Sequence, residues 1–250
     1  TQQGTPNETS ADREDTVHRF WHHSVSHQLN GHWSGTLPVS STDRPLWVYA
    51  NVTYQLPTPV SGAGYYYGIY TADTFNLSSV LKTATPQELQ SANVQATLRS
   101  STLIEDFDRD WQKEWFTYKP DEWPRKTNKL HDDQYQAPPG ATLALDVIAE
   151  QKNKLVILID QHAAEVQLTG GDRWQQVVLS PEDMKDFAGD GLADWSSVKQ
   201  LTLSGAERRR PQRGDDRPSR MIGGNWQGTP PRFRNLRWHV PAPAVPSDES

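Results

Sequence analysis

Eight short β-rich segments between residues 102 and 240 constrain the fold more than any other feature of the chain. Apolar side chains alternate with other residues most clearly over 143–147 and 155–159, and turn signals such as Pro138-Pro139-Gly140 and Gly170-Gly171-Asp172 separate the segments. A period of two over four to eight residues is typical of half-buried strands. The segments expected to be strands are Thr102–Phe107, Trp115–Tyr118, Ala141–Ala149, Lys154–Ile159, Ala164–Leu168, Trp174–Leu179, Val198–Ser204 and Phe233–Val240.

Regularly spaced short strands predict a mostly β fold with an antiparallel β-sandwich, and we expect its topology to be a jelly roll. No alternation of strand and helix runs through the chain, which argues against a Rossmann fold or an α/β barrel. The sandwich should occupy residues 99–241, with tails at 1–15 and 242–250, the first of them disordered.

Residues 16–98 predict a smaller β-rich part that begins with a helix. Apolar residues recur at near-helical steps over 16–30, and Gly31 follows as a stop signal. Segments 46–54 and 63–70 are rich in β-formers and predict a strand pair. Residues 85–92, with Pro86 after Thr85, predict a short second helix.

Histidines of the expected first helix form the pairs His18/His22 and His23/His27, each four residues apart. Two imidazoles on one helix face can chelate zinc. The Glu and the downstream ligand of a zinc motif are missing, so a polar helix face is the favoured interpretation.

Cysteine is absent from the 250 residues, which excludes disulfide scaffolds, thiol catalysis and iron–sulfur clusters. No apolar run approaches the roughly 18 residues of a membrane span, so we expect a soluble chain without a membrane partner. No Gly-x-Ser-x-Gly elbow or phosphate-binding glycine loop is present, and we expect no catalytic residue and no nucleic-acid partner.

Aromatic residues are the most informative candidates for a binding site. The chain has 10 Trp, and several stand among charged residues in the stretch DWQKEWFTYKPDEWPRK. An indole face stacks on the C–H groups of a sugar ring, while neighbouring polar groups bond the hydroxyls. We expect Trp115, Trp174, Trp195 and Trp238 in the core, packing to explain Trp21, Trp33 and Trp47, and sugar-stacking rings at Trp111, Trp123, Tyr135 and Trp226.

Charge divides unevenly along the chain. Residues 205–239 hold nine Arg and three acids, a net +6, whereas the whole chain carries −6. Arg suits planar contacts to sulfate, phosphate or carboxylate, so Arg125, Arg208 and Arg210 are candidate contacts to an anionic glycan. A flexible, solvated loop is the alternative interpretation of this segment.

Five carboxylates lie within residues 105–114. A solvated acidic turn, a calcium site and a pair of catalytic carboxylates are all open interpretations of them.

Two stretches resemble known families. RFWHHSVSHQLNGHWSGTLP, with the following DRPLWVYANVTYQL and VSGAGYYYGIYTADTFNLSSVL, resembles the region after the catalytic domain in bacterial hydrolases, frequent in planctomycetes, of the dienelactone-hydrolase-like and PhoPQ-regulated-protein-like α/β type. LIEDFDRDWQKEWFTYKPDEW, with the later WQQVVLSPEDMKDFAGDGLADWSSVKQLTLS and FRNLRW, resembles galactose-binding-like jelly rolls of secreted polysaccharidases.

The resemblance implies a non-catalytic, glycan-binding accessory module next to an upstream hydrolase domain, in a secreted or periplasmic protein. It also implies a structural calcium ion at Glu105, Asp106 and Asn235, although an Asp is more usual at the last position. The alternatives are a glycoside hydrolase or lyase that uses the 105–114 carboxylates, and a domain that only supports the hydrolase.

Overall fold

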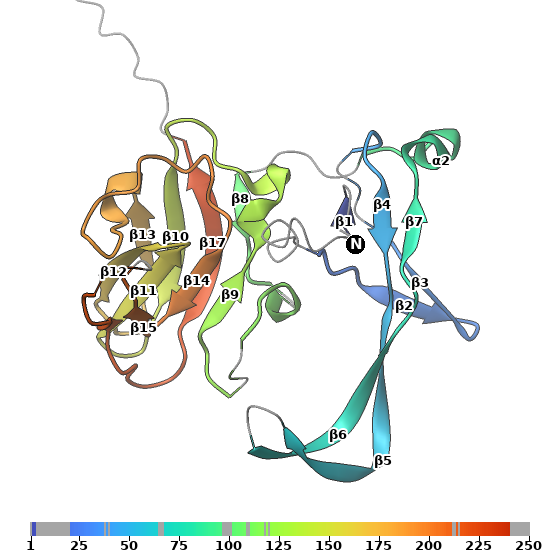
Figure 1. Cartoon of the computed structure of the whole chain (residues 1–250), viewed down its shortest axis with the longest axis horizontal. Coiled ribbons are helices and arrows are strands. Elements are labelled where there is room, and N and C mark those ends of the chain that lie inside the picture. Colours follow the sequence, from blue (N-terminus) through green and yellow to red (C-terminus); the bar gives the residue numbers. More distant parts are fainter. Residues whose placement is uncertain are drawn as a thin grey trace, which may run out of the picture. The chain divides into compact units, whose positions relative to one another are not determined.

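The computed structural model describes residues 2–3, 21–37, 39, 41–64, 68–96, 102–108, 111–117, 119, 121–211, 214 and 216–240 (Figure 1). The chain divides into two compact units. Unit 1 comprises Thr1–Glu8 and Ser24–Leu98, and unit 2 comprises Thr9–His23 and Arg99–Ser250. The expected tail at 242–250 and most of the tail at 1–15 lie outside the described residues.

Unit 2 is an antiparallel β-sandwich, as the sequence predicts. Its two four-stranded sheets have the orders β13-β10-β17-β8 and β12-β11-β14-β9. Their strands are β8 (Leu103–Glu105), β9 (Arg125–Thr127), β10 (Thr142–Ile148), β11 (Asn153–Ile159), β12 (His162–Leu168), β13 (Gln175–Leu179), β14 (Leu201–Ser204) and β17 (Arg232–His239). Numbered one to eight along the chain, these strands run 1-8-3-6 and 2-7-4-5, so every connection except β11–β12 crosses between the sheets. This order favours the jelly roll, which stays a prediction.

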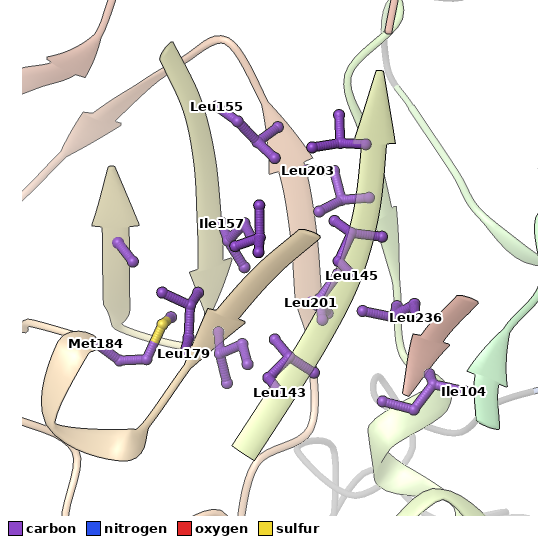
Figure 2. Packing of buried hydrophobic residues seen from close by; sticks show 14 of the residues in the cluster. Ile104, Leu143, Leu145, Leu155, Ile157, Leu179, Met184, Leu201, Leu203 and Leu236 are labelled. Atoms are coloured by element: carbon purple, nitrogen blue, oxygen red, sulfur yellow. The ribbon is translucent and has the colours of Figure 1, made fainter. Parts of the chain in front are cut away.

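The core of unit 2 lies between the two sheets. Alternate residues of β10 meet alternate residues of β11 and β14, as the leucines and isoleucines in Figure 2 show. Leu143, Leu145, Ile157, Leu201 and Leu203 are at most 1% exposed. Full burial of such a side chain contributes about 1.5–3 kcal/mol, so this layer is the main source of the fold's stability.

Two further strands and four short 3-10 turns complete unit 2. The hairpin of β15 (Ala206–Arg209) and β16 (Arg220–Gly223) falls in the Arg-rich segment, so the flexible-loop interpretation is wrong for these residues. A strand over 115–118 is also wrong in its described part, where Phe116 makes a single bridge to Lys126 of β9. The 3-10 turns are η2 (Trp111–Glu114), η3 (Lys129–His131), η4 (Asp133–Tyr135) and η5 (Pro181–Asp183).

Unit 1 consists of a small sheet, two hairpins and one helix. The sheet has the order β1-β4-β7, which places the start of the expected disordered tail in a strand. The elements are β1 (Gln2–Gln3), β2 (Ser26–Leu29), β3 (His32–Gly35), β4 (Leu46–Val48), β5 (Asn51–Gly64), β6 (Gly68–Ser78), β7 (Lys82–Ala84) and α2 (Pro86–Ser91). The expected strand pair exists, but it joins β5 to β6 rather than 46–54 to 63–70.

The helix expected over 16–30 is wrong where the structure describes it, because Ser26–Leu29 and His32–Gly35 form a hairpin. Asn30 and Gly31 link the strands with φ of 51° and 80°. Two positive φ values at Asn-Gly are typical of a type I′ turn, whose twist matches that of a hairpin. Residues 16–20, including His18, lie outside the described residues.

The short helix α2 confirms the prediction over 85–92. The Thr85 side chain accepts a hydrogen bond from the Glu88 backbone N–H, and the Glu88 carboxylate accepts one from the Thr85 N–H. This capping box and Pro86 fix the first turn. Leu89 then packs with Val39 and Leu46 in the small core of unit 1.

Candidate functional site

The tryptophans of unit 2 divide by exposure. Trp115, Trp195 and Trp238 are at most 4% exposed and belong to the core, as expected. Trp174 is 40% exposed, so its assignment to the core is wrong. It precedes β13, and its ring lies 4.2 Å from the guanidinium of Arg234 instead of between the sheets. Trp33 of unit 1, expected to be packed, is 66% exposed.

Three of the four predicted stacking residues belong to one series of ring contacts, which we call the aromatic row: Trp226, Trp123, Phe233, Phe107 and Trp111. Consecutive ring centroids are 4.8, 6.1, 5.3 and 5.1 Å apart. All five side chains are half-buried against the sandwich core. Each therefore has a packed side that fixes the ring and a remaining accessible part.

Trp226 and Trp123 sit at one end of the aromatic row and meet edge to face, at 65°. Gly205 brings the backbone between them: a β-carbon there would lie 3.4 Å from Trp226 and 3.5 Å from Trp123. The Trp226 indole N–H donates to the Thr229 carbonyl at 2.8 Å. These contacts hold both rings in place before any ligand arrives, which lowers the entropic cost of binding.

The loop that carries Trp226 is tied to the β10–β11 turn. Asn153 and Gln227 exchange two hydrogen bonds of 2.8 and 2.9 Å. The Glu150 carboxylate accepts from the Thr229 N–H and hydroxyl, both at 3.3 Å. The side chains of Gln227 and Glu150 are exposed, and amide and carboxylate groups of this kind can bond sugar hydroxyls.

Arg125 supports the other indole. Its guanidinium donates to the backbone carbonyls of Glu122 and Pro124, the two neighbours of Trp123. The contact of Arg125 to a glycan anion stays a prediction, and the observed bonds give Arg125 a positioning role for the Trp123 loop. Arg208 and Arg210 lie elsewhere, on and beside β15.

The carboxylates Glu105 and Glu114 share one ammonium group. Lys129 Nζ lies 2.7 Å from an oxygen of each, and it is 5% exposed. The Trp115 indole N–H also donates to Glu105, at 2.9 Å. A buried, bonded Glu–Lys–Glu group is the arrangement of a structural ion pair.

The residues expected to bind calcium have other partners. Glu105 bonds Lys129, Asp106 accepts from the Asp108 N–H at 2.9 Å, and Asn235 donates to Asp146 at 3.0 Å. In the part of the chain that the structure describes, no group of three His, Asp or Glu residues is arranged to hold a metal ion. The calcium ion stays a prediction.

Tyr135, the fourth predicted stacking residue, lies next to a polar network, with its ring centroid 6.0 Å from that of His22. His22 Nε2 lies 3.1 Å from Asp132 Oδ2 and 2.6 Å from Gln134 Nε2. Burial raises the pKa of Asp132, but hydrogen bonds from His22 and from the Gln134 backbone lower it more, so the net pKa falls below its ordinary value. Burial, followed by the nearby Glu114 and Asp132 carboxylates, raises the pKa of Tyr135.

Two groups of residues escape sequence reasoning. Trp174, Arg234 and Asp146 form a patch around strands β13, β10 and β17, where Arg234 Nε lies 3.2 Å from Asp146. Arg217 and Arg220 contact the Phe187 ring, and Arg209 is the cross-strand partner of Arg220. Only the register of the β15–β16 hairpin pairs Arg209 with Arg220, and no spacing in the sequence signals that register.

None of the helices that the structure describes has the length and apolar character needed to cross a membrane. Comparison of the chain with protein-family models, curated proteins and solved structures finds no match.

Proposed function

We propose that unit 2 is a non-catalytic module that binds a poly- or oligosaccharide through the aromatic row, within an exported polysaccharide-active hydrolase. One observation carries the proposal: Trp123 and Trp226 are half-buried and held from behind, and polar side chains flank them. Such rigid, amphipathic rings bind with little loss of conformational freedom.

Affinity gel electrophoresis with a panel of neutral and anionic polysaccharides tests the proposal. The wild-type chain should be retarded by at least one glycan. Trp226→Ala and Trp123→Ala should each weaken that binding by about tenfold, which equals about 1.4 kcal/mol. Trp33→Ala removes an exposed indole from unit 1 and is the matched control, with no expected change.

Two outcomes would contradict the proposal. One is the absence of retardation by every glycan, and the other is an equal loss in the Trp33→Ala control. Circular dichroism of each variant separates lost binding from lost folding, since both indoles pack against the core.

Two of the five carboxylates that the hydrolytic alternative could use belong to a structural ion pair. Glu105 is 6% exposed, and Lys129 bonds both Glu105 and Glu114. A catalytic acid and base must reach the glycosidic oxygen and a water molecule or anomeric carbon.

A second candidate role, support of an upstream α/β-hydrolase domain, is favoured by exposed apolar residues on the β2–β3 hairpin. Leu29 is 71% exposed and Trp33 66%. Exposed apolar groups of this size can mark a docking surface. A hydrolase domain of the resembled type, supplied as a separate chain, should then bind the wild type and not Trp33→Ser. Equal binding to both would contradict this role.

A further inference from the structure

Two arginines of unit 2 contact one phenylalanine ring, and a third lies across the β15–β16 hairpin from one of them. The guanidinium carbons of Arg217 and Arg220 each lie 4.9 Å from the centroid of the Phe187 ring. Arg209 is the direct cross-strand partner of Arg220 in the β15–β16 hairpin, so both side chains lie on the same face. We call Arg209, Arg217, Arg220 and Phe187 the arginine site.

Arg209 is held by carbonyl groups rather than by a carboxylate. It is 6% exposed, and its guanidinium donates to the backbone oxygens of Lys185, at 3.3 Å, and of Gln161. In the described part of the chain, neither Arg209 nor Arg220 forms an ion pair with a carboxylate. Burial, and then the charge of Arg220, lowers the pKa of Arg209.

Two nearby acids act on the pKa of Arg209 in the opposite direction to Arg220. Asp186 and Glu207 act on Arg209 more weakly than Arg220 does. One Asp186 oxygen accepts N–H groups from Ala188, Gly189 and Asp190 at 2.8–2.9 Å, which commits it to its own loop. Arg209 and Arg220 are directly opposite each other in the hairpin, and like charges in that arrangement are destabilising.

A bound anion would relieve this repulsion. Guanidinium groups bind sulfate and carboxylate oxygens in planar, two-point contacts. The Phe187 ring holds two of the groups by cation–π contact, and the carbonyls hold the third, so little side-chain freedom remains to be lost.

We propose that the arginine site binds an oxyanion carried by a polysaccharide, a sulfate ester or a uronate carboxylate. The polysaccharide in this proposal rests on the proposed function, whereas the anion contact is independent of the aromatic row. Arg208, a predicted ligand residue, alternates with Arg209 on β15 and lies on the opposite face of the hairpin.

Affinity electrophoresis of the full chain on dextran sulfate, polygalacturonate and uncharged dextran tests the proposal. We expect Arg220→Ala, and more strongly Arg217→Ala/Arg220→Ala, to weaken binding to one or both anionic gels by about fivefold or more. Arg208→Ala changes the net charge of the same hairpin equally and should change binding less than twofold. Affinity should also fall as salt rises.

The proposal is overturned if neither anionic gel retards the chain, or if Arg208→Ala weakens binding as much as Arg220→Ala. Retention on a single-stranded oligonucleotide that equals retention on the anionic gels, and that Arg220→Ala does not change, would also overturn it. That result would indicate general polyanion binding. If free sulfate competes as well as dextran sulfate, the site binds the ion and not the polymer, and the polysaccharide part of the proposal is wrong. Trp226→Ala separates the two proposals. If it abolishes binding to neutral glycans and leaves Arg220-dependent binding unchanged, the arginine site binds independently of the aromatic row.

Discussion

At the scale of single residues, the role of two carboxylates in the acidic stretch 105–114 depends on Lys129, which lies outside that stretch. The sequence shows five carboxylates and leaves open a turn, a metal site or a catalytic pair. The structure adds Lys129, whose Nζ lies 2.7 Å from both Glu105 and Glu114. Contacts between residues that are distant in sequence decide such cases, and a local motif contains no signal for them.

Lys129→Met tests how much this buried ion pair contributes to the free energy of unfolding. Glu105 would remain 6% exposed without its cation, and an uncompensated buried charge costs about 3–5 kcal/mol. The free energy of unfolding in urea should fall accordingly. Lys119→Met is the control: Lys119 pairs with Glu122 at 2.8 Å, but both side chains are exposed, and no measurable change is expected. Similar losses in both variants would contradict a structural role for Lys129.

Asp132 gives the molecule a predictable response to acid. Its pKa is lower in the folded chain than in the unfolded chain, so its contribution to stability is complete above its unfolded value, about pH 4, and is lost as the pH falls through the folded value. Asp132→Asn should therefore reduce stability at pH 6 and flatten the decline of the unfolding free energy between pH 5 and 3. An unchanged slope would mean that Asp132 gains nothing from His22.

At the scale of elements, apolar patterning predicts the central strands well. β10, β11, β12 and β13 lie within two residues of their expected bounds, because buried strands alternate strongly. The strands of unit 2 that the patterning does not predict, β9, β15 and β16, each contain Lys or Arg. Such residues are typical of edge strands, which discourages pairing with other chains. The same lack of apolar alternation hid the hairpin that holds the arginine site.

The candidate site was predictable only by residue type. Aromatic residues among charges indicated Trp111, Trp123 and Trp226, and the structure brings these three into the aromatic row. Phe107 and Phe233, which link them, carry no distinguishing signal, since Phe in a strand is ordinarily a core residue. Tyr135 and Trp174 show that local sequence does not determine the partners of a ring.

The β5–β6 ribbon is a two-stranded hairpin with exposed apolar side chains. On one face Val52, Tyr54, Phe75 and Leu77 are 42–53% exposed, and the Tyr54 and Phe75 rings stack at 5.1 Å. On the other face the Thr53 hydroxyl donates to Asn76. A two-stranded hairpin is marginally stable by itself.

We expect the amide hydrogens of β5 and β6 to exchange much faster than those of β10 and β11, because exposed backbone bonds open at low cost. Hydrogen exchange followed by mass spectrometry measures both sets in one sample. Equal protection at low protein concentration would contradict this expectation. Protection of the ribbon that grows with concentration would show that a second molecule covers it.

At the scale of the whole molecule, the two units differ in the size of their cores. Among the described residues, the buried core of unit 1 holds only Val39, Leu46 and Leu89. The core of unit 2 extends through both sheets of the sandwich, from Ile104 to Trp238. Since the free energy of folding scales with buried apolar area, unit 2 should carry most of the stability of the chain.

Separate cores predict separate unfolding transitions, with unit 1 melting first in a calorimetric scan. Leu89→Ala and Leu203→Ala are matched changes at positions that are 4% and 1% exposed, and each should cost about 2–5 kcal/mol in its own unit. Leu89→Ala should lower only the first melting temperature, and Leu203→Ala only the second. A single transition that both variants shift would show that the units unfold together. If instead each variant moves its own transition, the sandwich keeps its fold while unit 1 is open, as a binding module that acts by itself requires.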